Sequence, residues 1–143
     1  MAGIFIVSKD IRLPFSNSYR VKELINKVPL NEKVVSDYLM LNTISAYTDK
    51  PFYCLPAQKT LLFLSIGKDI NIQQDSGHYC NPLNDFFHKE QIKTLYMLST
   101  QSPKGLSEID SKLFSSFHVQ LIGKIEGAIE KGSNLYLYQI STL

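Results

Sequence analysis

The segment from residue 117 to residue 130 alternates between apolar and polar side chains with a period of two. All seven odd positions from Phe117 to Ile129 are apolar or glycine, and five of the seven even positions are polar. Such alternation is typical of a β-strand that buries one face. A helix over the same residues would carry Gly123 and Gly127 in its interior, at a cost of roughly 1 kcal/mol each. We therefore expect a strand here.

A turn signal follows this strand, and a second apolar run follows the turn. The string Lys131-Gly132-Ser133-Asn134 fits a two-residue hairpin turn with glycine at the first central position. A turn at this place would set Ile125 opposite Ile140 on the return strand. The sequence thus predicts a C-terminal β-hairpin over residues 117–141.

The rest of the chain predicts short helices and strands that do not alternate regularly. With 143 residues, of which 44% are apolar, the chain is long enough to bury one core. We expect a single α+β domain over residues 1–143, with an antiparallel or mixed sheet of about five strands covered on one face by about four short helices. The expected helices lie at residues 18–27, 31–44, 84–99 and 107–114. The expected strands before the hairpin lie at residues 3–7, 60–66 and 70–72, and residues 52–56 are expected to be extended because prolines flank them.

The charge balance argues against nucleic acid as a partner. The chain has 15 basic and 13 acidic residues, which gives a net charge of +2. Only two of the basic residues are arginines, the residue type best suited to bidentate phosphate contacts. A loose basic cluster runs from Arg12 to Lys27, and we interpret it as a solvated helix face.

No apolar run approaches the roughly 20 residues that a membrane-spanning helix needs. The apolar segment at residues 1–7 is short and lacks the basic residues of a secretory signal. Two cysteines do not make a disulfide scaffold. We therefore expect a soluble cytoplasmic protein with reduced thiols.

One group of residues has the types needed for nucleophilic catalysis. Cys54 or Cys80 could act as a nucleophile, with His78 as its base and Asn81 or Asp85 as the residue that orients the histidine. This arrangement predicts, as an alternative function, a cysteine-dependent hydrolase or transferase. The gap of 24 residues between Cys54 and His78 is short for such enzymes, and Leu55-Pro56 directly follows the first cysteine.

The same residues allow two other interpretations. Cys54, His78, Cys80 and His88 could ligate zinc, but the chain has no CxxC or HxxxH pair. Both cysteines also stand among aromatic residues, as buried structural cysteines commonly do. We therefore expect no metal and no cofactor, and favour structural roles for the thiols.

The leading hypothesis is a small protein-interaction or regulatory domain without catalytic activity. Signatures of phosphate-binding loops, dinucleotide sites and common hydrolases are absent from the sequence. Tyr136 and Tyr138 share one face of the expected last strand, and tyrosine is enriched at protein interfaces. These two rings are the candidate contacts with a protein partner. If the last strand is an edge of the sheet, it could accept a partner strand, and an edge strand would also allow homo-oligomerisation.

Overall fold

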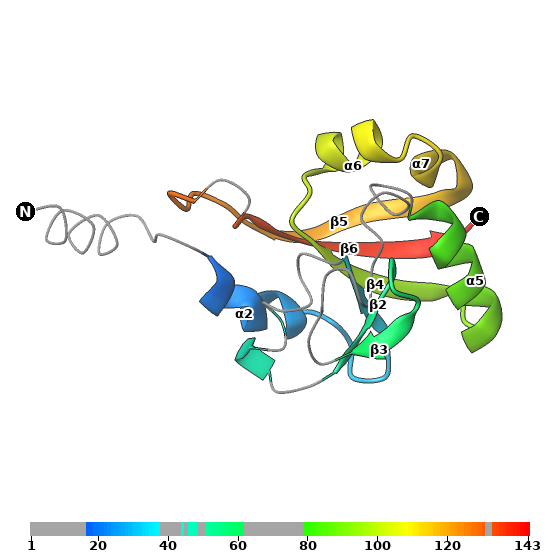
Figure 1. Ribbon diagram of the computed structural model, residues 1–143, viewed down its shortest axis with the longest axis horizontal. Coiled ribbons are helices and arrows are strands. Elements are labelled where there is room, and N and C mark those ends of the chain that lie inside the picture. Colours follow the sequence, from blue (N-terminus) through cyan, green and yellow to red (C-terminus); the bar gives the residue numbers. More distant parts are fainter. Residues whose placement is uncertain (1–16, 38–43, 45, 49–50, 62–78, 131–132) are drawn as a thin grey trace, which may run out of the picture.

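In the described part of the chain, six strands form one mixed sheet (Figure 1). The computed structural model describes residues 17–37, 44, 46–48, 51–61, 79–130 and 133–143. The strands are β1 (Val34–Ser36), β2 (Phe52–Cys54), β3 (Lys59–Leu61), β4 (Thr94–Ser99), β5 (Phe117–Ile125) and β6 (Leu135–Thr142). The helices are η1 (Ser18–Arg20), α2 (Val21–Ile25), α5 (Cys80–Glu90), α6 (Pro103–Ile109) and α7 (Leu113–Ser116). The predicted α+β class is confirmed, with one strand more than expected.

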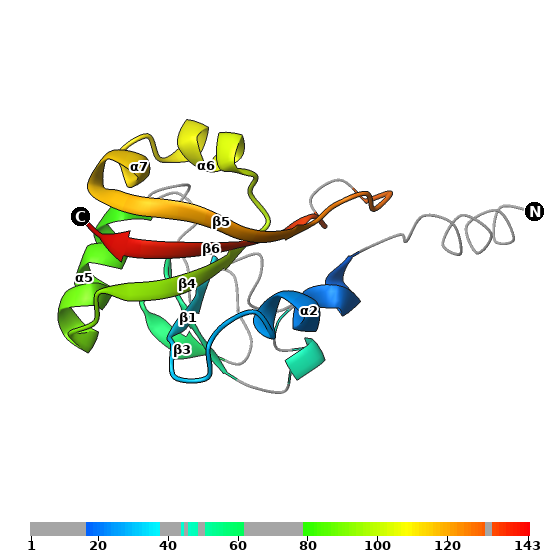
Figure 2. The ribbon, with the colours of Figure 1, turned by 180° about the vertical axis from the view of Figure 1, so that it is seen from behind.

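The sheet combines a parallel centre with antiparallel margins. Its order is β3-β2-β1-β4-β6-β5, and β1 runs parallel to both β2 and β4. β3, β6 and β5 each run antiparallel to their neighbours. The carboxyl ends of β1 and β4 therefore lie at the same end of the sheet, where Figures 1 and 2 place α2, while α5 and the chain's C-terminus lie at the other end.

Helices cover both faces of this sheet. Leu95 and Met97 of β4 pack into the cluster that contains α5, α6 and α7, whereas Tyr96 and Leu98 pack into the cluster that contains α2. Because side chains alternate along a strand, β4 is buried on both sides. The expectation of helices on one face only was wrong, and β6, like β4, is buried on both faces.

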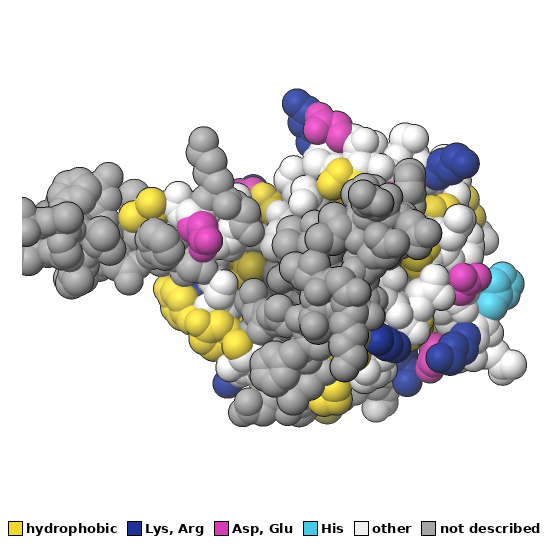
Figure 3. Space-filling view, in the orientation of Figure 1, with side chains coloured by type: hydrophobic (Ala, Val, Ile, Leu, Met, Phe, Trp, Pro, Cys, Tyr) yellow, Lys and Arg dark blue, Asp and Glu magenta, His cyan; other side chains and the backbone are white. Residues whose placement is uncertain are grey.

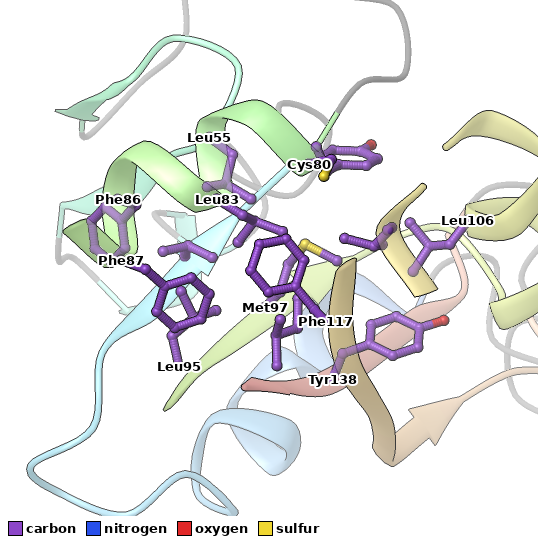
Figure 4. Close-up of a cluster of buried hydrophobic side chains, with 14 of the residues drawn as sticks. Leu55, Cys80, Leu83, Phe86, Phe87, Leu95, Met97, Leu106, Phe117 and Tyr138 are labelled. Atoms are coloured by element: carbon purple, nitrogen blue, oxygen red, sulfur yellow. The ribbon is translucent and has the colours of Figure 1, made fainter. Parts of the chain in front are cut away.

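The larger core lies between α5 and the sheet (Figure 4). Phe87 of α5 stacks on Phe117 at the start of β5, with ring centroids 5.4 Å apart. Leu83 lies in the same cluster, one helical turn before Phe87. Leu106 of α6 and Leu113 of α7 complete the cluster near β5. This packing fixes three helices on one face of the sheet.

Two expected helices contain strands instead. Residues 94–99, taken as the end of a long helix, form β4, and residues 34–36, taken as the first turns of another helix, form β1. α5 ends at Glu90 because Gln91 adopts a left-handed conformation with φ of 53°. Of the helix expected at residues 31–44, only Ile44 is helical among the described residues. Residues 46–48, just beyond its expected end, are helical as well.

The C-terminal hairpin is confirmed, but its predicted register was wrong. Ile125 pairs with Leu135 rather than with Ile140, and Val119 takes the position opposite Ile140. A β-bulge between Leu121 and Gly123 inserts one extra residue in β5. β5 ends at Ile125 and β6 begins at Leu135, so the strands end well before the predicted turn, whose Lys131 and Gly132 lie outside the described residues.

The bulge reverses which face the later residues of β5 occupy. Phe117 packs on the α5 side of the sheet, whereas Ile125 packs on the α2 side. Gly123 then lies directly beneath α2, where an added Cβ would be 3.0 Å from Leu24 Cδ2 and 3.0 Å from Lys27 Nζ. The glycine allows this close approach of helix and strand.

Two other expected segments fall outside the described residues. The strand predicted at residues 3–7 is one of them. The hairpin predicted around Gly67 is the other, although β3 and the antiparallel β2–β3 pair lie just before it.

Candidate functional site

The two cysteines lie on opposite faces of the sheet. Tyr53 of β2 packs on Phe86 of α5, with ring centroids 4.3 Å apart. Cys54 is the next residue of the strand, so its side chain points to the opposite face. It is fully buried with Phe52 and other apolar side chains. Cys80 begins α5 and packs in the core on the α5 side, so the two thiols do not share one site.

Asp110 already occupies the N-terminus of α5, where Cys80 lies. Its Oδ2 accepts hydrogen bonds of 2.8 Å from the backbone N–H groups of both Tyr79 and Cys80. The negative charge that a helix N-terminus favours is therefore supplied by this carboxylate. A small cavity of about 180 Å³ lies beside it, and Cys80, Asp110 and Lys112 contribute to its wall.

The predicted base of the catalytic arrangement, His78, lies outside the described residues. Asp85 and His88 are exposed on α5. The pairing of a thiol with His78 thus stays a prediction. Neither cysteine forms a disulfide. Within the described ranges, no group of three or more His, Cys, Asp and Glu side chains is arranged to hold a metal ion.

Tyr136 and Tyr138 belong to the core rather than to the surface. Only 3% of Tyr136 and 1% of Tyr138 are exposed. The Tyr138 hydroxyl donates a hydrogen bond of 2.7 Å to the carbonyl of Gln101, and the Tyr136 hydroxyl donates one of 2.8 Å to Glu126 Oε1. Burial, followed by the Glu126 hydrogen bond, raises the pKa of Tyr136 to about 12. Burial also raises the pKa of Tyr138.

A buried polar network at the carboxyl ends of β1 and β4 was not predicted. Asp37, which follows β1 and is 1% exposed, accepts hydrogen bonds from the Ser99 hydroxyl at 2.6 Å and from the Thr100 N–H at 3.1 Å. Ser99 Oγ in turn accepts one from the N–H of Gln101. The sequence signal was that Ser99 directly follows the apolar run of residues 95–98 and that Asp37 follows Val34-Val35 after one serine.

The outer edge of the sheet is formed by β5 and not by the last strand of the sequence, because β6 lies between β4 and β5. β5 is nine residues long and is the outermost strand at one margin of the sheet, whereas β3 at the opposite margin has three residues. In the part of the chain that the structure describes, no strand pairs with the outer edge of β5. Leu121 in its middle is 37% exposed, and Phe114 of the adjoining α7 is 39% exposed. Backbone pairing groups and apolar side chains therefore occur together at this edge.

Comparison of the chain with protein-family models, with curated proteins and with solved structures finds no match. In the described part of the chain, no helix has the length and apolar character that crossing a membrane requires.

Proposed function

We propose that this chain is a non-catalytic protein-interaction domain that binds an extended segment of a partner protein along β5. The observation that carries the proposal is the long outer edge of β5, with no strand paired to it among the described residues. An added strand gains main-chain hydrogen bonds at such an edge, and its side chains enter positions beside the alternating residues of the host strand.

The first half of β5 is the part best suited to strand addition. Residues 117–121 pair regularly with β6, and the bulge follows only after Leu121. Bulges and lysines are features that protect edges from pairing, and both the bulge and Lys124 lie in the second half of the strand. Five regular residues span about 17 Å, which is enough for a short peptide strand.

The side chains of this segment offer two different surfaces to the added strand. Val119 and Leu121 lie on the α5 side of the sheet, where Phe114 of α7 is also exposed. His118 and Gln120 are exposed on the other side. We therefore expect the partner strand to alternate apolar and polar residues, with its apolar residues on the α5 side.

Site-specific photo-cross-linking in the native cell tests the proposal. The photoreactive residue p-benzoylphenylalanine replaces Leu121 in one variant and Ile129 in the control. Ile129 is also apolar and, at 42% exposed, similarly accessible, but it lies outside the strands. We expect a partner protein to be cross-linked from position 121 but not from position 129. This cross-linked partner, once purified and added to the wild-type chain, should slow amide exchange at residues 117–121.

Leu121→Asp provides the second measurement, because a charge at a strand edge opposes pairing. We expect it to weaken binding of the purified partner at least tenfold, while Ile129→Asp leaves binding unchanged. Equal cross-linking at both positions, or amide protection elsewhere on the chain, would contradict the proposal. A cross-linked dimer of this chain would show instead that the edge binds a second copy.

A further inference from the structure

A second pocket of the molecule lies at the margin of the sheet opposite to β5. It is formed between β2 and β3 on one side and the last turns of α5 on the other. Its volume is about 380 Å³, within the range of small-molecule sites. Four separate stretches of the chain form its wall, namely residues 33–34, 51–53, 58–60 and 86 with 89–90. They include three lysines and one glutamate, and the rings of Tyr53 and Phe86 lie on the same face of the sheet.

The wall of this pocket is predominantly positive. Lys33 precedes β1, Lys59 begins β3 and Lys89 lies in the last turn of α5, so three distant parts of the chain contribute one ammonium group each. Glu90 is the one carboxylate of the described lining, and its Oε2 lies 3.4 Å from Lys33 Nζ. Figure 3 shows lysine and arginine side chains gathered over this part of the surface, beside β3 and the end of α5.

The other side of the pocket is aromatic. The Tyr53 ring packs on Phe86 with centroids 4.3 Å apart, and both residues line the pocket. Lys89 Nζ lies 5.9 Å from the centroid of the Tyr53 ring, so the cation and the aromatic wall are adjacent. An apolar group and a negative charge can therefore be bound side by side.

We propose that this pocket binds a small organic phosphate monoester, with the phosphate among Lys33, Lys59 and Lys89 and the apolar group against Tyr53. Lysine binds phosphate as a point charge, and several ammonium groups favour a dianion over a singly charged carboxylate. Among the described lining residues, three lysines stand against one carboxylate, that of Glu90. The site lies at the margin of the sheet opposite to β5 and is independent of strand addition.

The Tyr53 hydroxyl is suited to a site for an anion. Burial, and then the neighbouring Asp85 and Glu90 carboxylates, raise the pKa of Tyr53 above its ordinary value. The hydroxyl therefore keeps its proton through the physiological range and can serve as a neutral hydrogen-bond donor.

Titration of the full-length ¹⁵N-labelled chain with phenyl phosphate, inorganic phosphate and phenylacetate, followed by amide NMR, tests this site. We expect saturable shifts at Lys59, Thr60 and Lys89 with phenyl phosphate. Inorganic phosphate should bind more weakly because it lacks the ring, and phenylacetate more weakly because it has a single charge. Raising the salt concentration should weaken all three, since the lysines are exposed.

Charge-changing variants distinguish this pocket from diffuse binding to basic residues. Lys59→Gln and Lys89→Gln should each weaken phenyl phosphate binding by about three- to tenfold, and Glu90→Gln should tighten it. Lys104→Gln is the matched control, because Lys104 is an exposed lysine of α6 that also faces a glutamate, with Nζ 3.8 Å from Glu108 Oε1. No saturation at roughly 20 mM phenyl phosphate, far above millimolar affinity, would overturn the proposal. Equal weakening by Lys104→Gln, or tighter binding of phenylacetate, would also overturn it.

Discussion

The Ser99 hydroxyl donates a hydrogen bond of 2.6 Å to the Asp37 carboxylate, and this contact joins residues 62 positions apart. Asp37 follows β1 and Ser99 ends β4, so the bond ties together the carboxyl ends of two neighbouring parallel strands. The chain turns from β4 towards α6 at this point, and the Thr100 N–H also donates to Asp37. The network therefore fixes both the end of the strand pair and the exit of the next loop.

Ser99→Ala should lower the free energy of unfolding by about 1.5–3 kcal/mol, because it removes a hydrogen bond to a buried carboxylate. Urea denaturation of the full chain measures this change. Ser107→Ala is the control: the Ser107 hydroxyl is exposed and donates to the carbonyl of Lys104 within its own helix. That substitution should change the free energy by no more than about 0.5 kcal/mol. Equal effects of the two substitutions would show that the Ser99–Asp37 bond adds nothing to stability.

Asp110→Ala should destabilise α5 by about 2 kcal/mol. The substitution leaves the N–H groups of Tyr79 and Cys80 without their shared acceptor at the N-terminus of the helix. Amide exchange at these two residues should accelerate more than exchange in β6. Asp85→Ala, at an exposed position of the same helix, should leave both the exchange rates and the stability nearly unchanged. Unchanged exchange in Asp110→Ala would contradict this role.

The hairpin at the C-terminus could be predicted from its local pattern, but its register could not. Period-two alternation and the glycine turn signal correctly indicated two antiparallel strands. The bulge after Leu121 coincides with Ile122, an apolar residue at an even position. This one exception within β5 did not reveal the bulge, because Gly123, Lys124 and Ile125 resume the period of two. The position of the bulge depends instead on α2, which packs against Gly123 from the other face of the sheet.

The central strands of the sheet were harder to predict from the sequence than the C-terminal hairpin. Leu95, Tyr96, Met97 and Leu98 are all buried because helices cover both faces of β4. A continuous apolar run fits a buried helix as well as a buried strand, so periodicity alone could not separate the two. The polar pair Asp37 and Ser99 was missed for the same reason, since both expected elements had been assigned as helices and no strand ends were expected there.

Both thiols should react slowly with iodoacetamide at pH 6.5. Cys54 is completely buried and Cys80 is 8% exposed, so we expect each to react at least about tenfold more slowly than glutathione, with Cys54 the slower of the two. Mass spectrometry of Cys54→Ser and Cys80→Ser variants separates the two rates, and labelling in denaturant gives the fully accessible reference. Labelling faster than that of glutathione would indicate an activated thiol and would favour the cysteine-dependent enzyme that the sequence offered as its alternative.

Stability at high pH should depend on Tyr136. Burial and the hydrogen bond to Glu126 raise its pKa to about 12 in the folded chain, against an ordinary value near 10. Between these two values the unfolded chain has released the proton and the folded chain retains it, so rising pH favours unfolding. The contribution is intact below about pH 10 and is lost between about pH 10 and pH 12. Tyr136→Phe should therefore reduce the loss of unfolding free energy in this range, by at most about 1.4 kcal/mol per pH unit. Glu126→Gln should reduce it less, because burial is the larger cause of the shift. Denaturant unfolding at a series of pH values from 8 to 12 measures these slopes, and identical slopes for Tyr136→Phe and the wild type would contradict the assignment.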